Sequence, residues 1–315
     1  MNVQLHPTSV PPLELAFKRV DGQDIFMDVY IPPSATKEKP APVLLWWHGG
    51  GLLQGTRKAV APHMLSAPER HNICIISADY RLAPQTRMPG ILADTSDALA
   101  FISSQAFADA THNKVDSARV VLSGSSAGGW IALLVGTGIG FEACGLKKPL
   151  PVKGMAPIYP ITDLQDRFWK EKQRPTVTYM DRIIEREEVE EFLDPNGEKI
   201  SASRADGKRS MFYHYMVQEG ILSSLLLEGT GIAEEAFSVA PELRTGKYQP
   251  PPAYIITGNQ DGKVPHRQSL DVLSALEAMS ASVEYHELQV DHGFDKEPLY
   301  RMDSLYKYFN RVCAE

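Results

Sequence analysis

The chain opens with two short stretches in which hydrophobic and polar residues alternate. These stretches, residues 13–20 and 25–31, lie on either side of Asp21-Gly22. Strict alternation is typical of a strand with one buried face, and an Asp-Gly pair is typical of a two-residue hairpin turn. The pattern therefore predicts a β-hairpin at the start of the fold.

Later segments have a different pattern, because they are apolar at almost every position. Three such runs occupy residues 43–47, 73–78 and 120–122. Continuous apolar runs are expected for parallel strands that are buried on both faces. Between the second and third runs, apolar residues from Ile91 to Ile102 recur at helical spacing. This strand–helix–strand order predicts an α/β fold with a mostly parallel sheet flanked by helices.

The pattern changes in the middle of the chain. Residues 130–135 predict a helix and residues 154–159 a further strand, but residues 164–247 contain no run suited to a buried strand. That segment is amphipathic and charge-rich, which indicates helices. We interpret it as a helical lid, or cap, inserted into a core formed by residues 1–163 and 248–315.

The strand pattern resumes after this insertion. Residues 253–257 and 283–288 predict the last two strands, with a helix from about Pro265 between them. Apolar residues at helical spacing then predict a terminal helix that carries Leu299, Leu305, Phe309 and Val312.

Composition excludes several classes of protein. A chain of 315 residues that is 43% hydrophobic can bury a large core, and its net charge of −7 with scattered basic residues argues against a nucleic-acid partner. The 3 cysteines form no C-x-x-C pair, so no zinc site or disulfide framework is expected. No signal peptide is visible in residues 1–10 and no membrane span elsewhere, so we expect a cytoplasmic protein.

The strongest chemical signal is a G-x-S-x-G sequence centred on Ser126. It follows the predicted strand at residues 120–122 and opens a predicted helix, which is the setting of a nucleophile elbow. Such a turn strains the backbone of the serine, so small neighbours such as Gly124 and Gly128 are needed. The helix start also directs the amide of Ala127 at the reacting oxygen. These features predict Ser126 as a nucleophile.

A second signal is a histidine followed by three glycines, at residues 48–51. It comes directly after the apolar run that ends at Trp47. A tetrahedral intermediate of acyl transfer carries negative charge on oxygen, and backbone N–H groups can stabilise that charge. Consecutive glycines let two amides approach one point, so this segment predicts an oxyanion hole completed by Ala127.

The nucleophile requires a base and an orienting acid. His292 follows the last predicted strand, and Asp261 follows the one before it. The carboxyl ends of parallel strands meet at one edge of a sheet, where ligands bind in open α/β folds. The chain order Ser126, Asp261, His292 is the one expected for this nucleophile elbow. Rival acids are Asp163, Asp291 and Asp295.

Together these motifs resemble those of the hormone-sensitive-lipase-like carboxylesterases, a family of α/β-hydrolase fold. The resemblance rests on the glycine motif at 48–51, on Asp79-Tyr80-Arg81-Leu82-Ala83-Pro84, and on the elbow at 124–129. It implies a cofactor-independent serine esterase whose oxyanion donors are the amides of Gly50, Gly51 and Ala127, with His48 organising the loop. Ser125 departs from the family motif, which has an acidic residue there.

The resemblance leaves the substrate open. We expect a small-molecule carboxylic ester, either with a short or medium acyl group or derived from a specialised metabolite, and neither a metal nor a nucleic-acid partner. A homodimer is compatible with the pattern. Candidate pocket residues are Leu52, which replaces the family's usual aromatic residue, and Met211, Phe212 and Tyr215 of the insertion. The unusual insertion also leaves open an acyltransferase, lyase or cyclase of specialised metabolism. A ligand receptor is disfavoured, because a receptor need not keep Ser126, Asp261 and His292.

Overall fold

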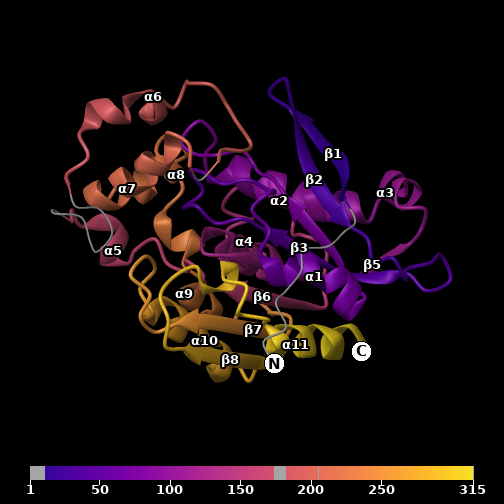
Figure 1. The fold of residues 1–315 in the computed structure, drawn as a ribbon. Coiled ribbons are helices and arrows are strands. Elements are labelled where there is room, and N and C mark those ends of the chain that lie inside the picture. The colour runs from indigo at the N-terminus through magenta and orange to yellow at the C-terminus, as the bar shows by residue number, and fades with distance from the viewer. Residues whose placement is uncertain (1–10, 174–181, 205, 315) are drawn as a thin grey trace.

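One eight-stranded sheet forms the centre of the computed structural model, which describes residues 11–173, 182–204 and 206–314 (Figure 1). Its strand order is β1-β2-β4-β3-β5-β6-β7-β8. The strands are β1 Leu13–Val20, β2 Gln23–Tyr30, β3 Ala41–Trp47, β4 Cys74–Ala78, β5 Val115–Ser125, β6 Gly154–Ile158, β7 Ala253–Gly258 and β8 Val283–Leu288. Only β2 runs against both of its neighbours, and all other pairs are parallel. The hairpin and the mostly parallel sheet are thus as predicted.

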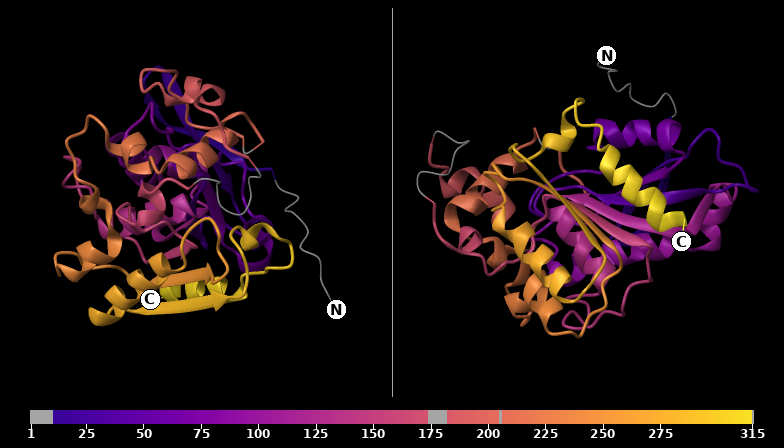
Figure 2. Two further views of the ribbon diagram at one scale, coloured as in Figure 1. Left: turned by 90° about the vertical axis from the view of Figure 1, so that its left-hand side faces the viewer. Right: turned by 90° about the horizontal axis from the view of Figure 1, so that it is seen from below.

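Helices cover both faces of this sheet because its inner strands are apolar on both sides. In β3, Val43, Leu45 and Trp47 belong to one buried cluster, which also takes side chains from α2 (Met88–Ile102), α4 (Ala127–Thr137) and α10 (Arg267–Ala278). Leu44 and Trp46 belong to the other, with α1 (Pro62–His71) and α11 (Asp303–Ala314). Figure 2 shows α11 lying across its face of the sheet. The α/β-hydrolase fold class is confirmed.

The chain between β6 and β7 contributes no strand to the sheet in its described part. Its helices are short: α5 Arg167–Lys170, η1 Arg186–Glu188, α6 Glu190–Leu193, α7 Arg209–Glu219, α8 Leu222–Leu227, η2 Glu234–Phe237 and α9 Val239–Arg244. Helices α5 to α8 gather on one side of the core (Figure 1). The remaining helices are α3 Gln105–Ala110 and η3 Phe294–Lys296. The division into a core and a lid at 164–247 stays a prediction.

The terminal helix begins later than the apolar pattern predicts. Leu299 lies before α11 and is 72% exposed, so its assignment to the helix is wrong. The reason is Met302, whose φ of 53° is outside the helical region and prevents the helix from extending back through it. Leu305, Phe309 and Val312 are buried in α11 as predicted.

Two expectations concern the ends of the chain and membranes. Residues 1–10, in which no signal peptide was visible, lie outside the described residues. Within the described ranges, no helix combines the length and the apolar character needed to cross a bilayer.

His63 of α1 is a buried histidine beneath the sheet. Its Nδ1 lies 2.8 Å from the hydroxyl of Tyr306, which itself donates to the carbonyl of His63. That hydroxyl therefore accepts the Nδ1 hydrogen, and the ring is neutral. Burial lowers the pKa of His63 to about 4, so the folded protein resists protonation of this ring.

We predict that His63 makes stability fall as the solution is acidified. The unfolded chain binds a proton at His63 below about pH 6.5, whereas the folded chain does so only near pH 4. The contribution of His63 to the free energy of unfolding is therefore complete above about pH 6.5 and is lost as the pH falls toward about 4. Urea unfolding should show that wild type loses about 2 kcal/mol more than His63→Asn between about pH 7.5 and about pH 5. Equal losses in the two proteins would contradict this account.

Candidate active site

Ser126 occupies a sharp turn between β5 and α4. Its φ of 60° and ψ of −120° are strained for a residue with a side chain. The surrounding structure holds this conformation: the Ser126 amide donates to the carbonyl of Ile158 at 2.9 Å. The turn also needs glycine at Gly124, where a Cβ would lie 2.1 Å from the carbonyl oxygen of Gly128. The Ser126 side chain is thereby directed away from the sheet, into a cavity.

His48 organises the loop that faces this turn. Its ring is 1% exposed and stacks on Tyr80, with ring centroids 4.3 Å apart. The Tyr80 hydroxyl donates to the His48 carbonyl at 2.8 Å, and the His48 Nδ1 lies 2.9 Å from the carbonyl of Gly49. Burial lowers the pKa of His48 to about 4, so the ring is neutral and its Nδ1–H donates to that carbonyl. These contacts fit a loop-organising role.

The glycines after His48 have backbones that favour glycine. Gly50 and Gly51 have φ of 105° and 66°. Neither amide donates a hydrogen bond to another described residue, whereas the carbonyl of Gly50 accepts from Leu53 and Gln54. Ala127 is the first residue of α4, whose first amides have no partner within the helix. The amides predicted to form the oxyanion hole are therefore available to a ligand.

His292 and Asp261 meet at the carboxyl edge of the sheet, after β8 and β7. The His292 Nδ1 lies 2.7 Å from the Asp261 Oδ2, and the Asp261 side chain is 1% exposed. The Asp261 Oδ1 accepts the amides of Lys263 and Val264, each at 2.8 Å. Since the carboxylate accepts the Nδ1 hydrogen, the His292 Nε2 is left as a proton acceptor.

The three rival acids have other partners in the structure. Asp163 accepts from the hydroxyl of Ser238, and Asp291 accepts the backbone amides of Gly262 and His292. Asp295 accepts from the hydroxyl of Ser125. Among the candidate acids, the structure thus joins Asp261 to the His292 ring.

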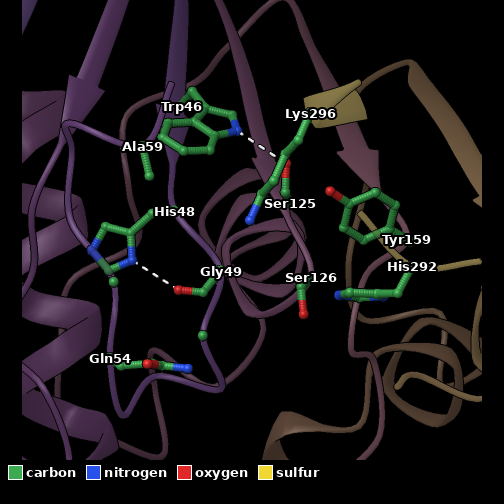
Figure 3. A pocket seen from close by; sticks show the side chains of 12 residues that line it. Trp46, His48, Gly49, Gln54, Ala59, Ser125, Ser126, Tyr159, His292 and Lys296 are labelled. Atoms are coloured by element: carbon green, nitrogen blue, oxygen red, sulfur yellow. Dashed lines mark hydrogen bonds between the residues drawn. The ribbon is translucent and has the colours of Figure 1, made fainter. Parts of the chain in front are cut away.

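Ser126 and His292 face a shared cavity of about 110 Å³ (Figure 3). Its lining comes from the loop after β3, from the elbow and from the segments after β6 and β8: Trp46, His48, Gly49, Gly50, Gln54, Gly55, Ala59, Ser125, Ser126, Tyr159, His292 and Lys296. Among the described residues, neither the cavity nor any other region contains a group of three or more His, Cys, Asp or Glu side chains that could hold a metal ion.

The predicted pocket residues lie elsewhere. Leu52 and Phe212 are fully buried, and Tyr215 is 7% exposed. Neither these three nor Met211 lines the cavity beside Ser126. Their contact with substrate stays a prediction. Trp130 of α4 is buried in the core, and its indole N–H donates to the carbonyl of Phe237 at 3.1 Å.

Comparison with known proteins places this geometry in a family. A family model described as alpha/beta hydrolase fold matches residues 44–196, which include the glycine motif and the elbow. The chain has the α/β-hydrolase fold. The predicted resemblance to hormone-sensitive-lipase-like carboxylesterases is thereby supported, and solved esterases share the fold.

Two solved structures and one protein sequence illustrate what this chain resembles. A Staphylococcus aureus protein of unknown function has a TM-score of 0.72 at 16% identity, over 96% of this chain and 99% of its own. A Thermogutta terrifontis esterase with propionate bound has a TM-score of 0.66 at 17% identity, over 96% and 94%. The non-reducing polyketide synthase pkbA of Emericella nidulans is 28% identical over 85% of this chain. The chain spans only 12% of that synthase.

Sequence reasoning missed Arg209, the first residue of α7. This side chain is 6% exposed, and its guanidinium donates to the carbonyls of Leu53 at 2.9 Å and Ala83 at 2.7 Å. It also donates to the Gln85 Oε1 at 3.1 Å. Arg209 therefore joins α7 to two other segments: the loop after the glycine motif and the segment that follows Leu82. No local pattern marks it, because its partners lie more than a hundred residues away.

We predict that Arg209→Met destabilises the protein by about 3 kcal/mol, because it leaves buried carbonyls without a donor. The matched control is Arg204→Met in the same segment. Arg204 is 82% exposed and, among the described residues, forms its ion pair with Asp206, so its replacement should leave stability nearly unchanged. Chemical denaturation of both variants measures the difference. Similar values for the two would show that Arg209 does not anchor the insertion.

Proposed function

We propose that this α/β hydrolase is a serine hydrolase that cleaves a carboxylic ester or thioester through an acyl-enzyme on Ser126. The observation that carries the proposal is the combination at one cavity of a strained serine, a histidine paired with a carboxylate at 2.7 Å, and unpaired loop amides. A glycine turn or a surface histidine alone would have carried no such inference. The three features together meet the needs of nucleophilic acyl transfer.

The proposed reaction has two halves. In the first, the Nε2 of His292 takes the proton of the Ser126 hydroxyl as its oxygen attacks the carbonyl carbon, and the amides of Gly50, Gly51 and Ala127 stabilise the negative oxygen. The protonated His292 then gives its proton to the leaving alcohol or thiol. In the second half, water attacks the acyl-enzyme with His292 again as base. Asp261 holds the ring orientation and stabilises the imidazolium throughout.

The relatives favour a particular class of acyl group. Five of them are named as non-reducing polyketide synthases, and this chain matches these five along 79–89% of its own length. A hydrolase related to part of such a synthase suits a polyketide-type acyl group carried as an ester or thioester. The substrate proposal therefore narrows from any short or medium ester to acyl groups of this type.

Acyl transfer or cyclisation is the second candidate. It keeps the same acyl-enzyme and replaces water with a hydroxyl, a thiol or a carbon nucleophile in the second half. The favouring observation is that the relatives are named synthases, for example the methylphloroacetophenone synthase of Cladonia uncialis, which is 27% identical over 92% of this chain. Product analysis with and without an added acceptor alcohol separates the two, since only hydrolysis gives the free acid alone.

We predict that a fluorophosphonate probe labels the wild-type protein once, as seen by intact mass. Ser126→Ala should take no label, because the attacking oxygen is absent. Ser125→Ala is the matched control from the adjacent position, and it should still take one label, although more slowly. An unlabelled wild type, or a labelled Ser126→Ala, would be decisive against the proposal.

We further predict that Asp261→Asn slows labelling by about 10³- to 10⁴-fold. The amide cannot hold His292 in the tautomer that accepts the serine proton. The comparison is Asp291→Asn, which removes a carboxylate next to His292 that bonds only backbone amides, and should slow labelling by less than about tenfold. If Asp291→Asn proved the more damaging of the two, the acid would be assigned wrongly.

A further inference from the structure

A second buried carboxylate, Asp295, lies beneath the cavity and takes no part in the proposed reaction. Its side chain is 1% exposed. Its Oδ2 accepts the hydroxyl of Ser125 at 2.9 Å, and its Oδ1 accepts the hydroxyl of Tyr159. The Ser125 oxygen in turn accepts the indole N–H of Trp46 at 3.3 Å (Figure 3). A buried carboxylate costs free energy unless hydrogen bonds satisfy it, and here two hydroxyl groups do so.

Tyr159 connects this carboxylate to the proposed base. Its ring lies 4.3 Å from the His292 ring, centroid to centroid, and its hydroxyl points away toward Asp295. Its backbone has an unusual conformation, with φ of 36°. The Tyr159 amide donates a hydrogen bond to the carbonyl of Ile256 at 2.7 Å, which holds this conformation. Burial raises the pKa of Tyr159 well above its usual range, so the hydroxyl stays a donor.

We propose that Asp295 is a positioning residue that fixes the elbow through Ser125 and the base through Tyr159. It acts on both sides of the reacting centre, because Ser125 precedes the nucleophile and Tyr159 contacts the base. The inference rests on the proposed function of Ser126 and His292. It also explains why Ser125 departs from the acidic residue of the family motif: here the carboxylate comes from the loop after His292, and a hydroxyl receives it.

The arrangement gives the tyrosine an electrostatic effect as well as a steric one. A phenol that donates to a carboxylate has a more negative ring face, and a ring face attracts a cation. The cation here is the imidazolium that His292 becomes as it takes the serine proton. Asp295 thus stabilises the protonated His292 indirectly, through the ring of Tyr159.

Several other charged groups face this pair. His292 is also faced by Asp261 at its Nδ1, by Asp291 at its backbone amide and by Lys296 across the cavity. Lys263 lies two residues beyond Asp261 in the loop between β7 and α10, and its amide donates to the Asp261 Oδ1. Asp295 also interacts electrostatically with His63 of α1 and Tyr306 of α11. None of these groups hydrogen-bonds Asp295 in the described structure, so its removal changes the His292 environment mainly through Tyr159 and Ser125.

The test is Asp295→Asn, with Glu297→Gln as control. Glu297 lies two residues along the same loop with an exposed side chain, so its variant removes the same charge without touching the cluster. For Asp295→Asn we expect fluorophosphonate labelling and p-nitrophenyl acetate turnover to slow about tenfold to a hundredfold, with KM little changed. The acid limb of kcat/KM should move down by about half a pH unit or more, because the imidazolium loses stabilisation. Glu297→Gln should match wild type in both.

A folded Asp295→Asn with wild-type rate and acid limb overturns the inference. If Asp295→Asn does not fold, Tyr159→Phe provides the test, because it keeps the ring beside His292 and loses the hydrogen bond to Asp295. A Tyr159→Phe variant with the wild-type rate and acid limb would also overturn the inference. A wild type that takes no label refutes the proposed function instead, which separates the two failures.

A transposed pair provides the positive test. Ser125→Asp combined with Asp295→Ser returns a carboxylate to the same cluster from the opposite side, within reach of Tyr159, whose hydroxyl also interacts with Ser125. We expect the double variant to label at least about tenfold faster than Asp295→Ser alone, recovering the loss of one hydrogen bond to a charged group. A double variant no faster than Asp295→Ser overturns the inference.

Discussion

The close approach of two backbone segments at the elbow is the constraint on which the rest of the site depends. Strand β5 and helix α4 come so near at Gly124 that a Cβ there would lie 2.1 Å from the carbonyl oxygen of Gly128. The Gly128 Cβ would lie 2.0 Å from the carbonyl oxygen of Trp47, at the end of β3. Helix α4 is therefore packed tightly against both β5, which precedes the strained serine, and the end of β3, which precedes the glycine motif. These two contacts fix the proposed nucleophile and the proposed oxyanion donors relative to each other.

The base and its acid are positioned by a different route. Asp261 and His292 lie in the loops that follow two neighbouring parallel strands, β7 and β8. Backbone hydrogen bonds from Asn259 to Leu288 and from Gln260 to Val290 continue the pairing into these loops. Strand β7 lies beside β6, which leads to Tyr159, and β6 lies beside β5, which leads to Ser126. Four neighbouring segments at one edge of the sheet thus each contribute one side chain. Their mutual distances vary little because the ladder of hydrogen bonds holds the strands.

This division explains how much could be predicted from the sequence. The strands, the elbow and the Asp261–His292 pair follow from local patterns combined with the rule that parallel strands end at one edge. Arg209 and Asp295 could not be found that way, because each is a single charged residue whose partners are distant in sequence. The start of α11 was misplaced for a related reason: the apolar spacing continues through Leu299, and only the backbone of Met302 interrupts it. Pocket shape depends on such contacts and was not predictable.

The anchoring of α7 by Arg209 has a consequence for motion. A lid in the usual sense swings on two hinges and leaves the chemistry beneath it intact. Here Arg209 holds the carbonyl of Leu53, in the loop that follows the glycine motif, and the carbonyl of Ala83, in the segment after β4. Gly51 also lies against the ring of Tyr213, to which a Cβ would come within 2.9 Å. An outward movement of α7 would carry strain into the catalytic loop. A chimaera that exchanged residues 164–247 alone would therefore lose the Arg209 contacts to Leu53 and Ala83 unless the new segment supplied an equivalent donor.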